Sequence, residues 1–296
     1  MQTSIRYNKI IELLENDQIV FAPALVSNGP SDDVTYIADS EYDMIMIEME
    51  HDGFSFESLK ATLNTLLNRR RIFENKTLQP DVVPFVRIPP NANEKNQWII
   101  KQTLDTGVYG IIIPHLTTVQ DAVEVISACR YPQLRTSLYT EPAGQRGWSN
   151  KYAPRYWGLT PEEYYDACDL WPLNPNGNLI LMAIIEDQEG VDNLRDILSS
   201  VQGIGIIWAG PGDMAVSMGL GTDSAHPEVQ QNLLTILETC KEFGVACATA
   251  ANTPDQVLLR IEQGFKVIIT PVSKSYPGLT AGLDYSRRQK SRGETP

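Results

Sequence analysis

Two carboxylates follow strongly apolar runs of the sequence, where an isolated negative charge would be costly. Glu186 follows the run Leu179–Ile185, and Asp213 follows Gly203–Ala209 after a short Gly-Pro-Gly turn. A buried carboxylate needs either a basic partner or a cation. Arg87 could swing across as a partner, so a buried salt bridge stays open as one reading. Two carboxylates without a nearby thiolate otherwise form a hard oxygen site that suits Mg²⁺, Mn²⁺ or Co²⁺ and leaves coordination positions for a chelating substrate.

An imidazole and a guanidinium stand at comparable positions along the chain. His51 follows Glu48 and Glu50 at the end of one apolar run, Arg87 ends the next, and His115 comes just after the fourth. A cation and a guanidinium together stabilise an oxyanion that develops on a keto oxygen. An imidazole tuned by a neighbouring carboxylate moves a proton near neutral pH. The combination predicts enolate chemistry, with no lysine placed for a Schiff base.

The turn before Asp213 adds a candidate anion site. Gly210 and Gly212 flank a proline there, and glycines let the backbone approach a ligand closely. Consecutive N–H groups at a helix start attract negative charge. We expect Gly210, Gly212 and Asp213 to receive the carboxylate of an α-keto acid.

These residues can act together only in a fold that brings the ends of its strands together, and the hydrophobic pattern predicts such a fold. Eight short apolar runs, each bounded by Gly, Pro, Asp or Asn, read as strands; they are Ile19–Leu25, Met44–Glu48, Val82–Arg87, Tyr109–Pro114, Leu179–Ile185, Gly203–Ala209, Val245–Ala248 and Lys266–Thr270. Segments with helical spacing alternate with them, and these include Phe56–Leu67, Val119–Cys129, Val229–Phe243 and Pro254–Gln263.

Continuous apolar strands that alternate with amphipathic helices predict a parallel sheet covered by helices. Eight strands favour an α/β fold of the (β/α)₈ TIM barrel type, in which the chemistry lies at the carboxyl ends of the strands. An open doubly wound sheet is the alternative, but the chain has no GxGxxG after its first strand and no GxxxxGK[ST] motif.

One stretch interrupts the alternation. Residues 134–178, between the fourth and fifth strands, are rich in Pro, Gly, Tyr and Trp and contain one short helical segment, Pro161–Cys168. A connection of this length is usually functional. We expect a single catalytic domain over residues 1–285 with this insertion, and a disordered basic tail over 286–296.

The composition excludes several classes of protein. The chain of 296 residues carries 24 Lys and Arg against 37 Asp and Glu, a net charge of −13, so a nucleic-acid partner is not expected. It has no apolar run long enough for a membrane helix and no signal-peptide pattern. Its four scattered cysteines suit a reduced compartment. We expect a cytoplasmic protein that acts on a small-molecule keto acid.

Several short strings resemble the HpcH/HpaI aldolase family, which includes the metal-dependent class II pyruvate aldolases related to 2,4-dihydroxyhept-2-ene-1,7-dioate aldolase. They occur in family order along most of the chain: DMIMIEMEH from Asp43, PFVR from Pro84, LDTGVYGIIIP from Leu104, RYP from Arg130, GQRG from Gly144, IIE from Ile184, GPGDM from Gly210 and HPEV from His226.

The resemblance implies a TIM barrel of the phosphoenolpyruvate/pyruvate type with Glu186 and Asp213 as ligands of a divalent metal. It implies Arg87 on the substrate keto oxygen, His51 as general acid and base, and Asp105 as an aspartate near the site. The implied activities are cleavage of 4-hydroxy-2-oxo acids to pyruvate and an aldehyde, and decarboxylation of oxaloacetate. The implied assembly is a homo-oligomer, a hexamer or a trimer.

The chain also departs from the family pattern. Glu48 stands where an aspartate is common, Gly205 replaces a common aspartate, and His115 replaces an apolar residue. His115 and the insertion are similar to macrophomate synthase, a family member that couples oxaloacetate decarboxylation to carbon–carbon bond formation with a 2-pyrone. The aromatic residues of the insertion could line an acceptor site or pack subunits together. A barrel that binds keto acids without catalysis is the third alternative.

Overall fold

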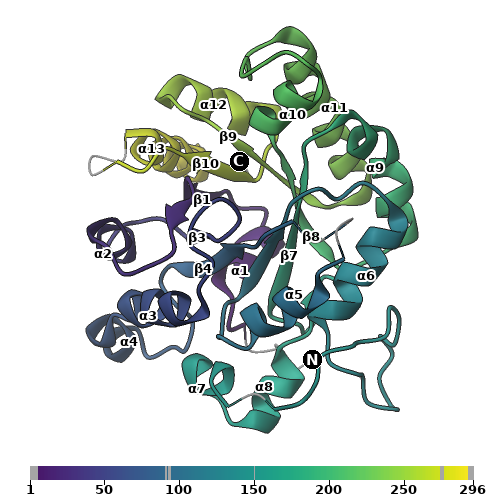
Figure 1. Ribbon diagram of the computed structural model, residues 1–296. Helices are drawn as coiled ribbons and strands as arrows, with labels where there is room; N and C mark the ends of the chain where they lie inside the picture. The colour runs from purple at the N-terminus through teal and green to yellow at the C-terminus, as the bar shows by residue number, and fades with distance from the viewer. Residues whose placement is uncertain (1–5, 91, 93–94, 150, 274–276, 293–296) are drawn as a thin grey trace.

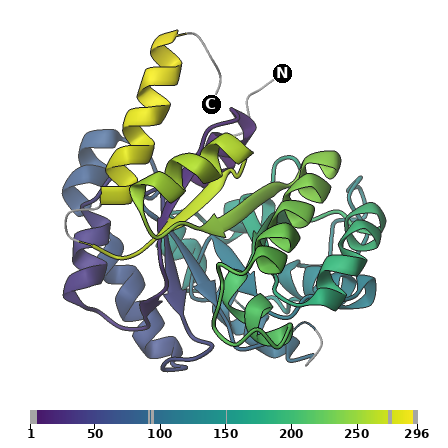
Figure 2. The ribbon, with the colours of Figure 1, turned by 90° about the horizontal axis from the view of Figure 1, so that it is seen from above.

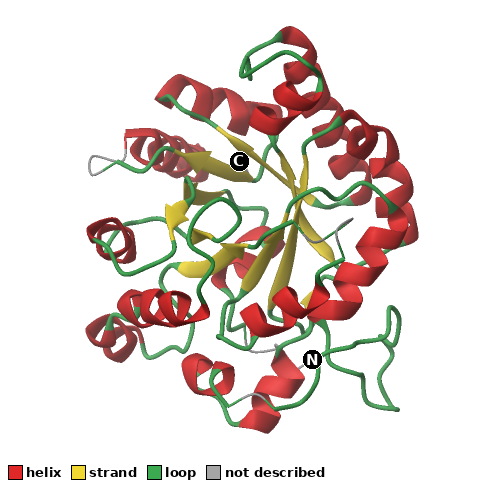
Figure 3. Cartoon of the chain, in the orientation of Figure 1, coloured by secondary structure: helices red, strands yellow, loops and turns green. Residues whose placement is uncertain are grey.

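Helices surround a sheet of parallel strands in the computed structural model (Figure 1; Figure 3). The structure describes residues 6–90, 92, 95–149, 151–273 and 277–292. Its strands are β1 (Val20–Pro23), β2 (Val26–Ser27), β3 (Met44–Glu48), β4 (Val83–Arg87), β5 (Gly110–Ile113), β6 (Leu170–Trp171), β7 (Leu179–Ile185), β8 (Ile204–Ala209), β9 (Ala246–Ala250) and β10 (Val267–Thr270). All eight predicted strands are confirmed, within two residues at each end, and β2 is an additional short strand directly after the predicted run Ile19–Leu25.

The strands follow one another around a nearly closed barrel. Their order is β1-β10-β9-β8-β7-β5-β4-β3-β2, with β6 paired to β7 and every pair parallel. The gap between β1 and β3 is bridged because the backbone N–H of Asp43 donates to the carbonyl of Phe21 at 2.9 Å, and the Asp43 carboxylate accepts the N–H of Phe21 at 2.9 Å. The barrel prediction is therefore confirmed over the open doubly wound sheet.

The helices begin where the sequence supplies capping residues. Thr118 caps α6 and Thr253 caps α12, and proline opens α11, α12 and α13. The helices are α1 (Lys9–Glu15), α2 (Asp32–Ala38), α3 (Phe56–Leu66), α4 (Arg69–Asn75), α5 (Gln97–Leu104), α6 (Val119–Cys129), α7 (Ala153–Trp157), α8 (Pro161–Ala167), α9 (Gln188–Ser200), α10 (Pro211–Ser217), α11 (Pro227–Phe243), α12 (Pro254–Gln263) and α13 (Pro277–Arg292). In the part of the chain that the structure describes, no helix is long and apolar enough to cross a membrane.

The carboxyl-terminal segment differs from the sequence prediction. Helix α13 runs to Arg292, so residues 286–292 are helical where disorder was expected, and residues 293–296 lie outside the described residues. The helix packs against the barrel through buried Leu279, and Arg287 bonds Glu41 at 2.8 Å. Its far end projects from the body of the molecule (Figure 2). The helix therefore continues from the packed segment around Leu279 into residues whose charge suggested disorder.

The insertion lies at the amino-terminal end of the barrel. Helix α6 carries the chain back from the end of β5 before the insertion begins, and β6 pairs with the first residues of β7, Leu179 and Ile180. Trp157 stacks on Tyr109, just before β5, with ring centroids 4.1 Å apart. The aromatic residues of the insertion are therefore at the opposite end from the carboxyl ends of the strands. They do not line an acceptor site there within one chain.

A buried arginine holds the insertion together. The Arg130 side chain is 0% exposed and donates to both carboxylate oxygens of Asp169, at 2.7 and 2.8 Å. It also donates to the carbonyls of Tyr139, at 2.7 Å, and Pro142, at 2.8 Å. One guanidinium thus joins the end of α6 to two distant parts of the loop.

Arg130→Ala is expected to lower the free energy of unfolding by about 3–5 kcal/mol, because it leaves the Asp169 carboxylate buried without its partner. Urea denaturation measures the change. The matched control is Arg195→Ala, which breaks an exposed pair with Glu242 and should cost less than about 1 kcal/mol. Equal losses in the two variants would contradict a structural role for Arg130.

Candidate active site at the carboxyl ends of the strands

Glu186 is a deeply buried carboxylate at this end of the barrel. It follows β7 directly and is 6% exposed. The backbone N–H of His115 donates to its Oε1 at 3.0 Å, and the His115 Nε2 lies 4.0 Å from the same oxygen. Burial raises the pKa of Glu186 to about 7, the His115 N–H opposes that rise, and the negative charge of Asp213 adds to it. Glu186 is thus largely shielded from water, and no arginine among the described residues pairs with it.

Asp213 is brought beside Glu186 by the turn after β8. The strand ends at Ala209, and Asp213 lies exposed in the first turn of α10. Gly210 allows the close approach of the two segments. A Cβ at position 210 would lie 3.0 Å from Ile184 Cγ2, 3.3 Å from Glu186 Cβ and 3.6 Å from Glu186 Oε2. Asp213 is thus near enough for its charge to raise the pKa of Glu186, and their pairing as ligands of one cation stays a prediction.

Arg87 is held by two other carboxylates. Its Nε donates to Glu48 Oε2 at 2.9 Å, its Nη2 donates to the same oxygen, and Nε lies 3.0 Å from Glu50 Oε2. The pairing follows from the sheet, because Glu48 and Arg87 end adjacent strands in register. Arg87 therefore does not neutralise Glu186, and the salt-bridge alternative for that carboxylate is not realised.

Glu48 and Glu50 have different partners. Glu48 Oε1 accepts the backbone N–H groups of Glu50, at 2.6 Å, and His51, at 3.3 Å, so it fixes the loop after β3. Glu50 Oε2 lies 3.5 Å from His51 Nε2. Burial raises the pKa of Glu50, while Arg87 and His51 oppose the rise. The His51 side chain is 67% exposed, so it is open to a substrate while Glu50 orients it.

The sequence predicted Glu50 only as a neighbour of His51. Its side chain is 4% exposed and contacts both Arg87 and His51. The signal was present, because Glu48 and Glu50 are two residues apart at a strand end and residues with this spacing share a face. The alternation continues past the end of β3 and brings both carboxylates to Arg87.

The group carries more negative than positive charge. Arg87 pairs with Glu48 and Glu50, whereas Glu186 and Asp213 have no guanidinium partner among the described residues. Among the described residues no group of three or more His, Cys, Asp and Glu side chains is arranged to hold a metal. Glu186 and Asp213 are the two residues here that could hold a divalent cation as hard oxygen ligands, and water or substrate would have to complete the coordination.

Asp105 is not part of this group. It caps the carboxyl end of α5, before β5, and pairs with the buried Arg146 of the insertion at 2.9 Å. It therefore lies at the amino-terminal end of the barrel. Gly205, near the start of β8, also belongs to that end, because a Cβ there would lie 3.1 Å from the carbonyl of Trp171. The Gly205 departure from the family pattern thus concerns packing of β6 and not the chemistry of this site.

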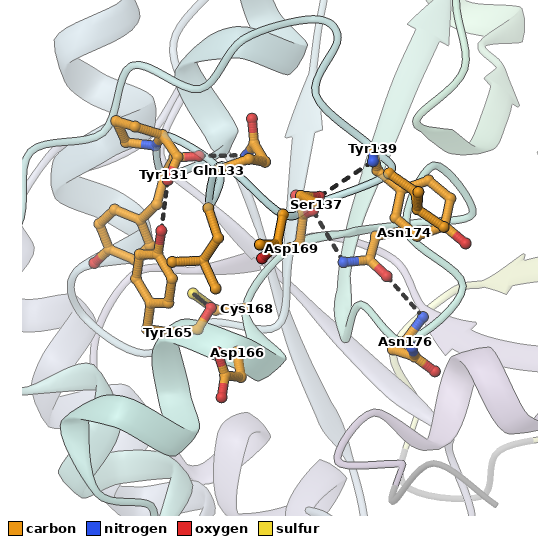
Figure 4. A pocket seen from close by; sticks show the side chains of 14 residues that line it. Tyr131, Gln133, Ser137, Tyr139, Tyr165, Asp166, Cys168, Asp169, Asn174 and Asn176 are labelled. Carbon is orange, nitrogen blue, oxygen red and sulfur yellow. Dashed lines mark hydrogen bonds between the residues drawn. The ribbon is translucent and has the colours of Figure 1, made fainter.

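The insertion has a cavity of its own, of about 250 Å³. Tyr131, Tyr139, Tyr165 and Asp169 are among the residues that line it (Figure 4). Asn174 donates to Asp169 at 3.1 Å inside it. Because Arg130 already engages the Asp169 carboxylate, this cavity is built by the same contacts that fold the insertion.

Gly210→Ala is expected to weaken Mn²⁺ binding at least threefold, because the added methyl group must displace Ile184 or Glu186. Gly212→Ala is the matched control, since a Cβ at position 212 meets nothing within 4 Å. Electron paramagnetic resonance of free Mn²⁺ measures both affinities. An equal loss in the two variants would contradict the close-approach role of Gly210.

Glu186→Gln is expected to stabilise the metal-free protein at pH 8 by on the order of 1–3 kcal/mol. A carboxyl whose pKa is raised by folding to about 7 favours the folded state at low pH, and that contribution is lost as the pH rises through 7. The amide has no such dependence. Thermal unfolding with a chelator at pH 5 and pH 8 should show a difference between variant and native protein that grows with pH. A difference that shrinks with pH would contradict it.

Comparison with known proteins agrees with the barrel fold. A sequence model of HpcH/HpaI aldolase/citrate lyase matches residues 28–269. The 5-keto-4-deoxy-D-glucarate aldolase of Citrobacter koseri is 32% identical over 168 residues, which cover 57% of each chain. An HpcH/HpaI aldolase/citrate lyase family protein from Burkholderia cenocepacia has a TM-score of 0.73 at 22% identity, over 97% of this chain and 98% of that one.

Macrophomate synthase shares the fold as well. Its structure has a TM-score of 0.63 at 22% identity, over 96% of this chain and 88% of its own. The matched segment covers little more than half of the Citrobacter relative, but the family match extends over most of the barrel. The chain belongs to the HpcH/HpaI aldolase/citrate lyase family.

Proposed function

We propose that the protein is a metal-dependent carbon–carbon lyase that cleaves or forms 4-hydroxy-2-oxo acids through a pyruvate enolate. One observation carries the proposal: Glu186 is buried beside Asp213 while the guanidinium of Arg87 is bound by Glu48 and Glu50. The family contains aldolases and lyases, and the relative from Citrobacter koseri is named as an aldolase. Both support this class of reaction.

Glu186 and Asp213 would hold the cation, which we propose to be Mg²⁺, with Mn²⁺ or Co²⁺ also accepted by oxygen ligands. When bound, the cation supplies electrostatic stabilisation for the negative charge on the keto acid. The substrate carboxylate would approach Gly210 and Gly212. Gly212 offers open space for it, since a Cβ there would meet nothing within 4 Å.

Arg87 would donate to the keto oxygen. Its contacts with described residues engage Nε and Nη2, so Nη1 is the donor that a substrate oxygen would meet. Because Glu48 and Glu50 fix the guanidinium before a substrate arrives, little reorganisation accompanies development of charge. Arg87 would therefore serve as a preorganised oxyanion donor.

His51 would move the proton. In the cleavage direction it accepts the proton of the 4-hydroxyl group as the bond between C3 and C4 breaks, and the bonding electrons pass to C3 and the keto oxygen as the enolate. The same proton is then returned to C3 to give pyruvate and an aldehyde. Glu50, 3.5 Å from His51 Nε2, would hold the imidazole in place between these steps.

Decarboxylation of oxaloacetate would use the same site, because loss of CO₂ from that acid leaves the same enolate. A macrophomate synthase-like reaction with a larger acceptor is less favoured by the structure. The insertion that suggested it lies at the other end of the barrel. The ordered set of Glu48, Glu50, Arg87 and His51 also favours a working enzyme over a barrel that only binds keto acids.

The native protein with Mg²⁺ or Mn²⁺ is expected to exchange the methyl protons of pyruvate for deuterium in D₂O, because enolate formation is shared by every reaction above. Proton NMR measures the exchange. Chelation of the metal, Glu186→Gln and Asp213→Asn should each lower the rate at least 100-fold, while Arg195→Ala should not change it. Exchange at the full rate after metal removal would contradict the proposal.

Product analysis separates the overall reactions. Cleavage of 5-keto-4-deoxy-D-glucarate to pyruvate and an aldehyde would support the aldolase. Release of CO₂ from oxaloacetate, with no cleavage of any 4-hydroxy-2-oxo acid, would leave the enolate step in place but contradict the aldol reaction.

A further inference from the structure

We propose that His115 serves the site through its backbone N–H, as a positioning residue for Glu186, and not through its imidazole. The inference rests on the proposed function, because the purpose of the positioning is to present Glu186 to a cation. His115 has a φ of +57°, a left-handed conformation that residues other than glycine adopt rarely. In that conformation its N–H donates to Glu186 Oε1 at 3.0 Å.

The turn that carries His115 is fixed at both ends. Ile113, at the end of β5, is in register with Ala183 of β7. At the other end the Thr118 side chain caps α6, and the Asn193 side chain donates to the carbonyl of Thr117 at 2.9 Å. Five residues, 114–118, must therefore join a fixed strand to a fixed helix. The left-handed residue at position 115 is what aims an N–H group at Glu186.

The imidazole of His115 interacts with Glu186 less closely than the backbone N–H does. Its Nε2 lies 4.0 Å from Oε1, beyond hydrogen-bond distance, and the His115 side chain is 40% exposed. The backbone donor is nearer and belongs to a chain segment that cannot rotate freely. Its bond to Oε1 leaves Oε2 on the side of Gly210, 3.6 Å from the place where a Cβ would lie. The carboxylate is thus oriented toward the turn that carries Asp213.

Replacement of His115 separates backbone from side chain. His115→Gly and His115→Asn accept a left-handed conformation, whereas His115→Val disfavours it. We expect the first two to bind Mn²⁺ within threefold of the native protein and the third to bind about 5- to 30-fold more weakly, the factor that corresponds to the cost of the left-handed conformation. Thermal unfolding of each metal-free variant reports whether it is folded. If His115→Val does not fold, His115→Ala takes its place with a loss of at least threefold.

A second measurement does not depend on metal. The chain has three histidines, so labelling with ¹⁵N-histidine gives three backbone amide signals, and the signal lost in His115→Asn identifies residue 115. We expect this amide proton to be shifted downfield and to move upfield by at least 0.3 ppm in Glu186→Gln, while the amide of His226 stays in place.

The outcomes are distinct. Loss of Mn²⁺ binding in His115→Gly and His115→Asn to the same extent as in His115→Val would overturn the inference in favour of the imidazole. Native affinity in the valine variant would overturn it too, because binding would then depend on neither the imidazole nor the left-handed conformation. If the chemical shift of the residue 115 amide proton does not change in Glu186→Gln, the inference is overturned as well. A native protein that binds no Mn²⁺ would contradict the proposed function, whatever the amide signal shows.

Discussion

The constraint on which the site depends is the placement of a carboxylate where water is excluded and no guanidinium of the described residues reaches it. Glu186 is 6% exposed, and its carboxylate accepts the backbone N–H of His115 and lies 4.0 Å from the His115 imidazole. Charge in such a place is costly unless a counter-ion arrives. The barrel supplies enough packing elsewhere to tolerate that cost. The same burial that raises the pKa of Glu186 would strengthen its attraction for a divalent cation.

The other carboxylates make this arrangement possible because they occupy the arginine. Glu48 ends β3 beside Arg87 at the end of β4, and Glu50 follows on the same face. If Arg87 had a single partner, its guanidinium could turn toward Glu186 and fill the place of a cation. Two partners fix it. Glu48 also holds the backbone of the loop that carries His51, so one side chain positions both the oxyanion donor and the proton carrier.

Much of this arrangement could be predicted from the sequence, because the relevant signals are local. Parallel strands buried on both faces leave unbroken apolar runs, and a polar residue that ends such a run lies at one edge of the sheet. That rule was enough to bring Glu48, Arg87 and Glu186 together. It did not identify the end at which residues 134–178 lie, which follows from the pairing of β6 with β7. Asp105 was expected near the site from the family resemblance, and it lies instead at the end of α5, paired with Arg146. The left-handed conformation of His115 depends on fixed ends contributed by β7 and α9, which no local pattern reveals.

The two ends of the barrel differ in how far their charged side chains are compensated by partners. At the amino-terminal end, Arg130 is fully buried but bonds a carboxylate and two carbonyls, so its charge is compensated within the chain. At the carboxyl end, the carboxylates outnumber the guanidinium and compensation is incomplete. A compensated charge rigidifies a loop, and an uncompensated one creates affinity for a ligand. The insertion can therefore enlarge the barrel without disturbing the site, because its contacts with Arg130 lie at the opposite end of the barrel from Glu186.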